Sequence, residues 1–495
     1  MNKINSLLFQ NDIVALLPEL FLAMAFLIIL VHGSFQVVTA ISLYTYLTPS
    51  ISRLTLVVLF LSLILVLNNP VINQIVWNAT FITDNVGTWS KFMVISSMFF
   101  CVLVSEDYIF LARIRAYEIF VFFIGICLSL CLLISSYDLI SIYLSMEFLS
   151  LIFYTLATWK RDSGFSAEAG LKYFILGSLA SVFFLFGASL LYFVMGTTNL
   201  GSLALLFEDL TSSSIIAHLG LLCLGSALLF KLGAAPYHMW VVDVYEGAPT
   251  LVSLIFAAVP KFAILVVLCR IAFISSWSLF PSLWGGLFCT CGILSLFIGC
   301  LGGLGEIKIK RVLAYSGIGH VGFLCLGLSC GSLEGVQSIF FYLIVYMLTA
   351  VFTWTYLLHL QPLKKNCLSL VDSVGLAQSS PILGFITCLM FFSLAGIPPF
   401  GGFFAKVLVF VALIDGYFYL VAIFAVFTSV ISAFYYLRLI KILFFEKTHT
   451  WVFFDAMSKS QALVLGLTSF IVLALIFNPN IFYLLSYKLG LTFLI

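Results

Sequence analysis

Long apolar runs separated by short polar stretches dominate this chain. A helix needs about 20 mostly apolar residues, within a range of about 17–25, to cross the hydrocarbon core of a bilayer. By this pattern we expect fourteen such helices, at residues 13–33, 54–69, 91–110, 117–137, 139–159, 168–196, 217–245, 248–274, 281–303, 311–331, 335–360, 380–413, 416–445 and 461–487. The pattern predicts an all-α polytopic membrane protein with about 14 transmembrane helices.

Composition supports this fold class. Of the 495 residues, 63% are hydrophobic and 8% are charged, against about 25% charged in soluble domains. The net charge of +2 does not indicate nucleic-acid binding. The 12 cysteines lie scattered in apolar runs without a CxxC motif, so we interpret them as small hydrophobic residues and predict no metal site. We expect no removable targeting segment, because the first apolar run is long enough to stay in the membrane.

Basic residues in the loops predict the orientation of the chain. Lys and Arg are retained on the cytoplasm-like side of a membrane. If odd-numbered helices end on one side, that side collects Arg53, Arg113, Arg115, Lys160, Arg161, Lys308, Lys310, Arg311, Lys364, Lys365, Arg438, Lys441, Lys447 and Lys459. The other side has only Lys3, Lys91, Arg270 and Lys488. This bias predicts an even number of helices, with both termini on the outer side.

Four lysines lie inside the predicted membrane helices: Lys172, Lys231, Lys261 and Lys406. Each costs about 2.5–3.5 kcal/mol at a helix centre on insertion scales, so each needs a reason to be there. Lys172 has two candidate partners, Glu168 four residues earlier and Glu147 on the preceding helix. For all four, a buried structural ion pair is the alternative to a functional role.

Two of the predicted helices are interrupted by proline. Pro236 breaks the seventh helix, and Pro398 with Pro399 breaks the twelfth. Backbone groups freed in lipid must find partners in neighbouring groups or water, so buried breaks tend to line polar cavities. If helices 4–8 and 9–13 form two five-helix units, both breaks fall in the fourth helix of a unit. This correspondence is typical of inverted repeats with an ion path at the midplane, although kinks without function remain an alternative.

Two histidines complete the set of candidate groups. His238 follows the break at Pro236, and His320 lies in the tenth predicted helix. The ordinary pKa of histidine suits a proton relay, but a hydrogen-bonded structural role is equally compatible with the sequence. The predicted division is an N-terminal three-helix segment (1–116), a first repeat (117–274), a second repeat (275–447) and a C-terminal helix (448–495), all within one membrane domain.

Five segments together resemble the antiporter-like membrane subunits of respiratory complex I. They are SMEFLSLIFYTLAT, AEAGLKYFILGSLAS, FKLGAAPYHMWVVDVYEGAPT, KIKRVLAYSGIGHVGF and AGIPPFGGFFAK, in this order along the chain. The resemblance implies that Glu147 and Lys172 form an acid–base pair. It also implies that Lys231 is the pumping lysine on broken helix seven, Lys261 the central lysine and Lys406 the terminal lysine on broken helix twelve.

The resemblance also implies a function. The chain is expected to translocate protons across the mitochondrial inner membrane, with both termini on the intermembrane-space side. NADH, FMN, iron–sulfur clusters and ubiquinone are expected in partner subunits and no cofactor in this chain. The implied partners are other membrane-arm subunits, including a neighbouring antiporter-like subunit, accessory subunits and lipids. The sequence itself has no phosphate-binding glycine loop after a strand and no cysteine cluster for iron–sulfur ligation.

Two other functions remain compatible with the sequence. A cation/proton antiporter subunit of the Mrp type would use the same lysines without NADH. A structural membrane subunit would use them only in buried ion pairs.

Overall fold

The computed structural model describes residues 11–39, 44–71, 73–111, 117–160, 162–209, 215–275, 277, 283–360, 369–446 and 456–494. The loop residues Lys3, Arg113, Arg115, Arg161, Lys364, Lys365 and Lys447, which contribute to the predicted charge bias, lie outside these ranges. The chain divides into two compact units. The first comprises Met1–Leu156, Phe174–Leu228 and Val259–Ser278, and the second comprises Ala157–Tyr173, Leu229–Ala258 and Leu279–Ile495.

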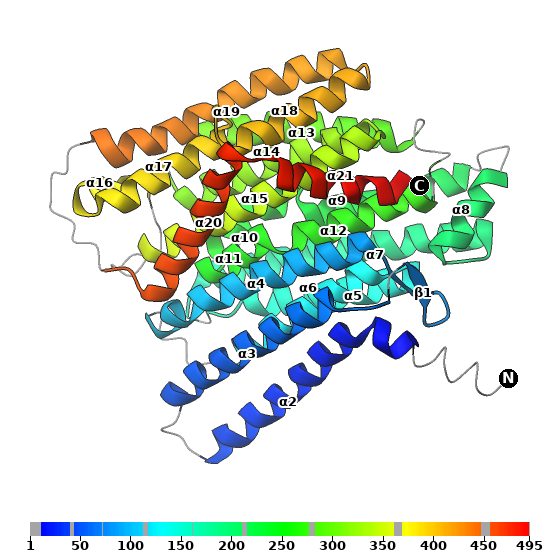
Figure 1. Ribbon diagram of the computed structural model, residues 1–495, viewed down its shortest axis with the longest axis horizontal. Coiled ribbons are helices and arrows are strands. Elements are labelled where there is room, and N and C mark those ends of the chain that lie inside the picture. Colours follow the sequence, from blue (N-terminus) through cyan, green and yellow to red (C-terminus); the bar gives the residue numbers. More distant parts are fainter. Residues whose placement is uncertain are drawn as a thin grey trace. The chain divides into compact units, whose positions relative to one another are not determined.

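The first unit contains, wholly or in part, the N-terminal helices and the end of the eighth predicted membrane segment (Figure 1). Its helices are α2 (Leu17–Thr39), α3 (Tyr44–Leu67), α4 (Asn85–Leu111), α5 (Glu118–Ser135), α6 (Leu139–Ala157), α7 (Gly164–Met195), α8 (Leu200–Asp209), α9 (Ile215–Leu232), α12 (Pro260–Cys269) and the π-helix η1 (Arg270–Ser275). A short antiparallel hairpin joins β1 (Gln74–Val76) to β2 (Phe81–Thr83). Helix α2 packs on α3 and α5, and α12 packs on α4 and α5.

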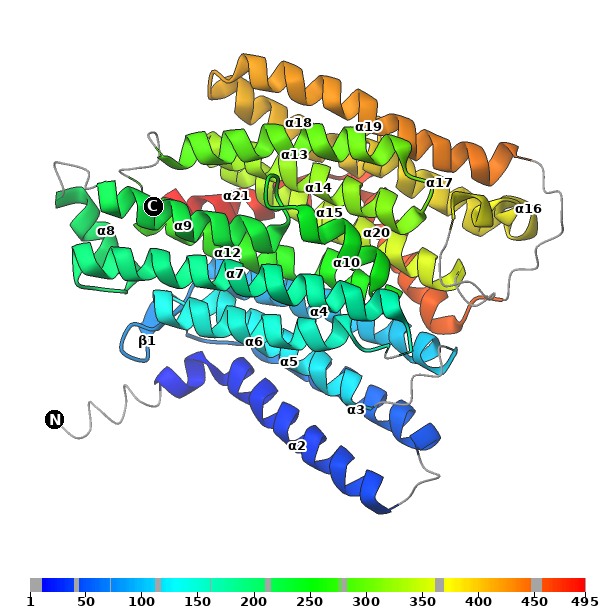
Figure 2. The ribbon, with the colours of Figure 1, turned by 180° about the vertical axis from the view of Figure 1, so that it is seen from behind.

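The second unit is built around α15. Its elements are α10 (Met239–Gly247), α11 (Thr250–Ala258), α13 (Gly285–Gly305), α14 (Ile309–Ser329), α15 (Leu333–Leu360), the 3-10 helix η5 (Leu370–Ser373), α16 (Leu376–Ser379), α17 (Pro381–Ala395), α18 (Gly401–Asp415), α19 (Tyr419–Phe445), α20 (Lys459–Phe477) and α21 (Asn480–Leu494). Helix α15 contacts α11, α14, α17, α18, α20 and α21, while α13 lies beside α14 and α19 (Figure 2). The apolar part of α15 that could cross a membrane is 94% buried, which makes α15 the central helix of this unit.

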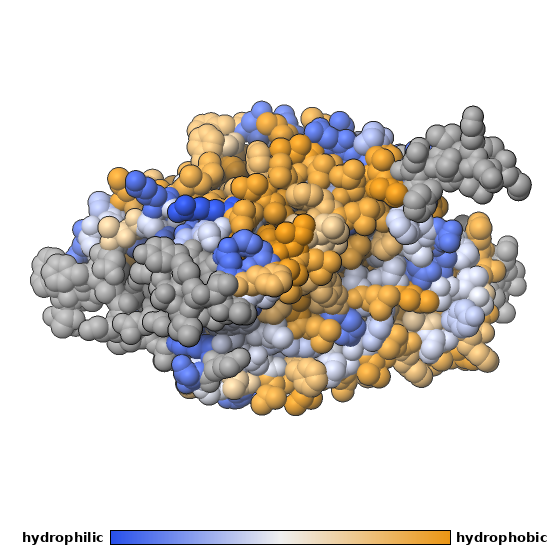
Figure 3. Space-filling model, turned by 90° about the horizontal axis from the view of Figure 1, so that it is seen from below, coloured by the Kyte–Doolittle hydropathy of each residue, from blue (hydrophilic) through white to orange (hydrophobic). Residues whose placement is uncertain are grey.

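The prediction of an all-α polytopic membrane protein is confirmed. Thirteen helices within the described residues are long and apolar enough to cross a membrane. The predicted segment 380–413 forms α17 and α18, with a break between Ala395 and Gly401 where Pro398 and Pro399 predict one. Hydrophobic residues cover much of the face shown in Figure 3. Large apolar side chains such as Phe193, Phe427 and Phe470 are exposed, as expected where lipid replaces water.

Some predicted boundaries are wrong. Segment 461–487 ends as a helix at Phe477, and α21 begins separately at Asn480. Pro479 explains this, because the residue before a proline is disfavoured in helical conformation. Segment 248–274 is confirmed as one apolar membrane segment, Thr250–Ile274, although its helix is interrupted before Pro260, which begins α12. The hairpin and α8 were not predicted, since both lie in connections between apolar runs.

Two basic residues assigned to the outer side, near the ends of predicted membrane segments, are buried in ion pairs of the first unit. Lys91 on α4 pairs with Glu19 in the first turn of α2. Arg270 begins η1 and donates from its Nη2 to both carboxylate oxygens of Asp84, at 2.8 and 2.9 Å. Its Nη1 donates to the carbonyl oxygen of Ser136 at 3.2 Å. Arg270 therefore joins the start of η1 to residues next to the hairpin and to the end of α5.

We predict that Asp84→Asn destabilises the folded chain strongly. Arg270 is 1% exposed, and removing one partner of a buried ion pair costs about 3–5 kcal/mol because the other charge stays buried. The melting temperature of the purified membrane assembly measures this effect. Glu118→Gln, at an exposed carboxylate in the first turn of α5, is the control. Equal melting temperatures for the two variants would contradict the prediction.

Candidate functional site

The break in the seventh predicted helix begins where α9 ends, as the position of Pro236 predicts. Gly233 adopts a left-handed conformation with φ of +77°. The amide of Ala234 donates to the carbonyl of Leu229, and that of Gly233 donates to Phe230, both at 3.0 Å. These bonds form a Schellman-type helix end, which satisfies carbonyls that the interruption leaves free.

Side chains complete this helix end. The indole Nε1 of Trp240 donates to the carbonyl of Phe230 at 2.9 Å. Lys231 lies in the last turn of α9, where the negative end of the helix dipole favours a cation. His238 is 8% exposed and immediately precedes α10. The structure therefore places Lys231 and His238 on either side of the break at Pro236.

The break in the twelfth predicted helix ends α17 in the same way. Gly396 has φ of +79°, and the amide of Ile397 donates to the carbonyl of Phe392 at 3.1 Å. The bond from Ile397 spans five residues, as does the bond from Ala234 in the first break. In both breaks a proline, Pro236 or Pro399, follows the left-handed glycine by three residues. The two interruptions therefore have the same backbone conformation at the helix end. The second differs in having an additional proline, Pro398, directly before Pro399.

Lys406 satisfies one of the carbonyls at the end of α17. Its Nζ donates to the carbonyl of Ala395 at 2.7 Å and lies 5.4 Å from the ring centre of Phe323. Lys406 is 5% exposed. A side chain on Gly396 would meet it, since a Cβ there would lie 2.7 Å from the Lys406 Cδ. The glycine is needed both for the turn and for the approach of the lysine.

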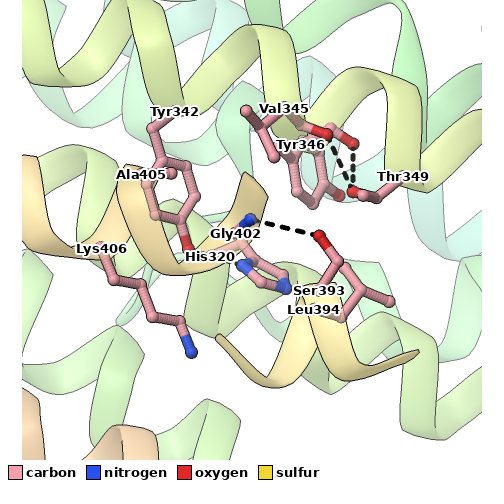
Figure 4. A pocket seen from close by; sticks show the side chains of 10 residues that line it. All are labelled: His320, Tyr342, Val345, Tyr346, Thr349, Ser393, Leu394, Gly402, Ala405 and Lys406. Atoms are coloured by element: carbon pink, nitrogen blue, oxygen red, sulfur yellow. Dashed lines mark hydrogen bonds between the residues drawn. The ribbon is translucent and has the colours of Figure 1, made fainter. Parts of the chain in front are cut away.

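His320 lies beside Lys406 in a group of tyrosines (Figure 4). Its Nδ1 is 2.6 Å from the hydroxyl of Tyr342, and its Nε2 is 3.1 Å from the hydroxyl of Tyr436. His320 and Lys406 line two cavities of about 10 Å³ each. A cavity of this size is about the minimum that holds one water molecule. The structure therefore brings two of the predicted site residues together with hydroxyl groups that can exchange protons.

Lys172 lies in a separate, half-exposed ionic group. Its Nζ is 2.7 Å from Glu168 and 2.7 Å from Asp243 on α10. The alternative in which Lys172 pairs with Glu168, four residues earlier, is confirmed. The pairing of Lys172 with Glu147 stays a prediction. Glu147 on α6 accepts a hydrogen bond from the Ser150 hydroxyl at 3.0 Å.

The ionic group continues onto the first residues of α14. Glu246 near the end of α10 bonds both to Lys308 and to the Nε of Arg311. The neighbouring Lys310 donates to the carbonyl of Ala248 at 2.9 Å. These basic residues thus fix the C-terminal end of α10, where a helix dipole favours positive charge. A cavity of about 170 Å³ adjoins the group and is lined by Lys172, Asp243, Glu246, Lys308 and Arg311, together with Phe165, Glu168, Ala169 and Gly247.

Lys261 is the one predicted site lysine in the first unit. Lys172 and Lys231 lie in the parts of α7 and α9 that belong to the second unit. Lys261 lies at the second position of α12 and is 5% exposed. The helix begins at Pro260, a residue suited to a first helical position because its missing N–H has no partner there. The break before this lysine was not predicted, although Pro260 is visible in the sequence.

Sequence reasoning missed the acidic partners Asp243 and Glu246. We interpreted the stretch around them as the end of the broken seventh helix and the acidic polar turn that leads into the eighth. Their spacing of three residues, with the basic run at Lys308 to Arg311, was a usable signal. Nothing in the local pattern indicated that the two stretches meet.

Comparison with known proteins gives one consistent result. Residues 136–432 match the family described as NADH:quinone oxidoreductase/Mrp antiporter, TM. NADH-ubiquinone oxidoreductase chain 2 of Marchantia polymorpha is 38% identical over 98% of this chain and 99% of its own length. NADH-quinone oxidoreductase subunit N of Paramagnetospirillum magneticum is 34% identical over 94% of this chain and 95% of its own. A chain in respiratory complex I from Thermus thermophilus with bound aureothin is 29% identical, with a TM-score of 0.77, covering 94% of this chain and 98% of that one.

We predict that Gly396→Ala displaces the Lys406 amino group and destabilises the break. A left-handed conformation costs a residue other than glycine about 1–2 kcal/mol, and the added Cβ would lie 2.9 Å from the Lys406 Nζ. The melting temperature of the purified assembly should fall, and a structure of the variant should show Lys406 moved. Gly466→Ala is the control, because a Cβ there has nothing within 4 Å. An unmoved lysine and an unchanged melting temperature would refute this account.

Proposed function

The chain belongs to the family of antiporter-like membrane subunits found in NADH:quinone oxidoreductases and Mrp antiporters, and we propose that it translocates protons as a membrane-arm subunit of respiratory complex I. NADH oxidation and quinone reduction then take place in other subunits of the enzyme, which hold the NADH, FMN, iron–sulfur and ubiquinone sites. Chain 2 and subunit N proteins that are 38%, 35% and 34% identical to this chain match 98%, 97% and 94% of it.

The observation that carries this proposal is the position of Lys406 in the broken helix. Its amino group bonds to the carbonyl of Ala395, and it lines water-sized cavities with His320. Burial disfavours the charged form of a lysine, so a change in neighbouring charge can make it release or take up a proton. The hydroxyls of Tyr342 and Tyr436 extend the hydrogen-bonded chain from His320.

The matching breaks support a second proton-carrying position at Lys231. Both α9 and α17 end with a left-handed glycine and a hydrogen bond across five residues. This likeness favours two repeats, 117–274 and 275–447, each with its fourth helix interrupted. Lys231 and Lys406 then act at corresponding breaks. Lys261 acts between them as the central carrier, and His238 with His320 relays protons.

Glu147 and Lys172 are proposed to gate this path. When the two are paired, the positive charge of Lys172 is neutralised and no longer repels a proton on Lys231. When they separate, that repulsion favours transfer along the path. Moving one elementary charge across about 100 mV costs about 2.3 kcal/mol. The redox reaction in the partner subunits must supply this energy.

The proposed setting is the inner mitochondrial membrane, with both termini on the intermembrane-space side. The chain is a multi-pass membrane protein, and relatives named NADH-ubiquinone oxidoreductase chain 2 occur in plants. The loop charges support the orientation. Proposed neighbours are another antiporter-like subunit, accessory subunits and lipids.

Removing either break lysine should reduce proton pumping while the enzyme still oxidises NADH. We predict this for Lys231→Ala and for Lys406→Ala, because each change interrupts one proposed carrier site. Protons translocated per NADH oxidised in reconstituted vesicles measure the effect, with assembly checked on a native gel. Lys488→Ala, at an exposed lysine on α21, is the control. Unchanged pumping in both assembled variants would reject the proposed function and favour structural roles for these lysines.

Glu147→Gln tests the gate. The amide keeps the shape of the side chain and its contact with Ser150 but cannot neutralise a lysine. We predict a lower ratio of protons pumped to NADH oxidised in the assembled enzyme. Glu118→Gln serves as the matched control for loss of one carboxylate. An intact pumping ratio in the Glu147 variant would remove this residue from the mechanism.

A further inference from the structure

Asp243 lies between two cations that approach its two carboxylate oxygens. Its Oδ2 is 2.7 Å from the Nζ of Lys172, and its Oδ1 is 4.0 Å from the Nη2 of Arg311. The first separation is a full ion pair with a hydrogen bond. The second is a longer ion pair, beyond hydrogen-bond distance. A rotation of the Asp243 side chain that brings Oδ1 closer to Nη2 would therefore let the carboxylate accept a hydrogen bond from Arg311.

Arg311 is held in position without help from Asp243. Its Nε bonds to Glu246, and its Nη1 donates to Glu306 at 3.4 Å. Glu246 is itself held by Lys308. The guanidinium thus turns a different nitrogen toward each of three carboxylates, and Nη2 is the one whose carboxylate lies farthest away.

Lys172 would keep a partner if Asp243 left it. Glu168 lies 2.7 Å from its Nζ on the same helix. The side chains of Lys172, Asp243 and Arg311 are 43%, 40% and 33% exposed in this chain. The adjoining cavity of about 170 Å³ has room for several water molecules. Water can therefore solvate the carboxylate as it moves, so the exchange leaves no bare buried charge.

We propose that Asp243 is an exchangeable positioning residue that moves between Lys172 and Arg311. With Asp243 on Lys172, two carboxylates neutralise the lysine. With Asp243 on Arg311, only Glu168 remains, and Lys172 is freer to move and exerts more of its positive charge on neighbouring groups. The exchange transfers no proton. This inference rests on the proposed function, since it assigns the control of Lys172 to a carboxylate on α10.

Asp243→Asn tests the exchange in the whole enzyme. The amide has nearly the same size but makes no ion pair with either cation. NADH oxidation with an artificial electron acceptor should be unchanged, while protons pumped per NADH should fall. Asp243→Glu keeps the charge and should restore pumping at least in part. Glu118→Gln is the control, because it removes an exposed carboxylate in the first turn of α5, while the ion pairs of Lys172 are with Glu168 and Asp243.

The partner arginine provides a second test. Arg311→Lys keeps one positive charge for Glu246 but removes the separate Nη2 group, so pumping should fall. In the double variant Asp243→Asn with Arg311→Lys, pumping should be no lower than in Asp243→Asn alone, because the arginine acts through the carboxylate. Additive losses would indicate two independent structural roles and overturn the exchange.

The outcomes also separate this inference from the function on which it rests. Normal pumping in Asp243→Asn together with impaired pumping in Lys406→Ala would overturn the exchange and leave proton translocation standing. Normal pumping in Asp243→Asn, Lys231→Ala and Lys406→Ala alike would reject both proposals. If Asp243→Asn fails to assemble, Arg311→Lys decides, and normal pumping in that variant overturns the exchange.

Discussion

A helix interrupted inside a membrane must satisfy the backbone groups that the interruption frees, because lipid offers no hydrogen bonds. Both breaks meet this constraint first with a left-handed glycine and a hydrogen bond across five residues. Side chains then complete each helix end, Trp240 in one break and Lys406 in the other. Since the last carbonyls of a helix carry partial negative charge, the break that needs a donor also stabilises a cation. The interruption and the buried lysine are therefore parts of one arrangement.

Helices α13 and α14 pack closely together, and α14 carries His320, which lies beside Lys406. A Cβ on Gly299 would lie 2.6 Å from the amide nitrogen of Gly319, so only glycine permits this approach. Small residues serve membrane helices in this way, because packing replaces the hydrophobic effect that is lost in lipid. Gly319 directly precedes His320, whose ring bonds to tyrosines on α15 and α19. Glycines that look like neutral apolar positions in the sequence thus help to hold His320 in its place.

Hydropathy was enough to predict most membrane segments, because lipid imposes one requirement on every spanning helix. Prolines likewise located both breaks at Pro236 and at Pro398 with Pro399. The ionic partners were harder to predict. Lys172 and Asp243 are 71 positions apart, and their meeting depends on how α10 is held by the first turn of α14. Pro479 and Pro260 carried usable local information that long apolar runs obscured. The failures concern tertiary contacts and short interruptions, which hydrophobic periodicity does not report.

The two groups of charges in the second unit differ in what a change of partner costs. Lys406 is buried, so losing its carbonyl partner would leave a charge without solvation, which is expensive unless a proton leaves. Asp243, Lys172 and Arg311 are partly exposed, and ion pairs of that kind contribute little to stability because water screens the charges. Exchange among them requires little energy and no change of protonation. Ions that exchange partners at little cost in free energy are suited to regulating a proton path. A buried lysine, which is unstable as an unpaired charge, is suited to taking up and releasing protons. In the proposed mechanism these roles fall on different residues: the exchangeable ions lie around α10, and the buried lysine lies on α18 with its amino group bonded to the last residue of α17.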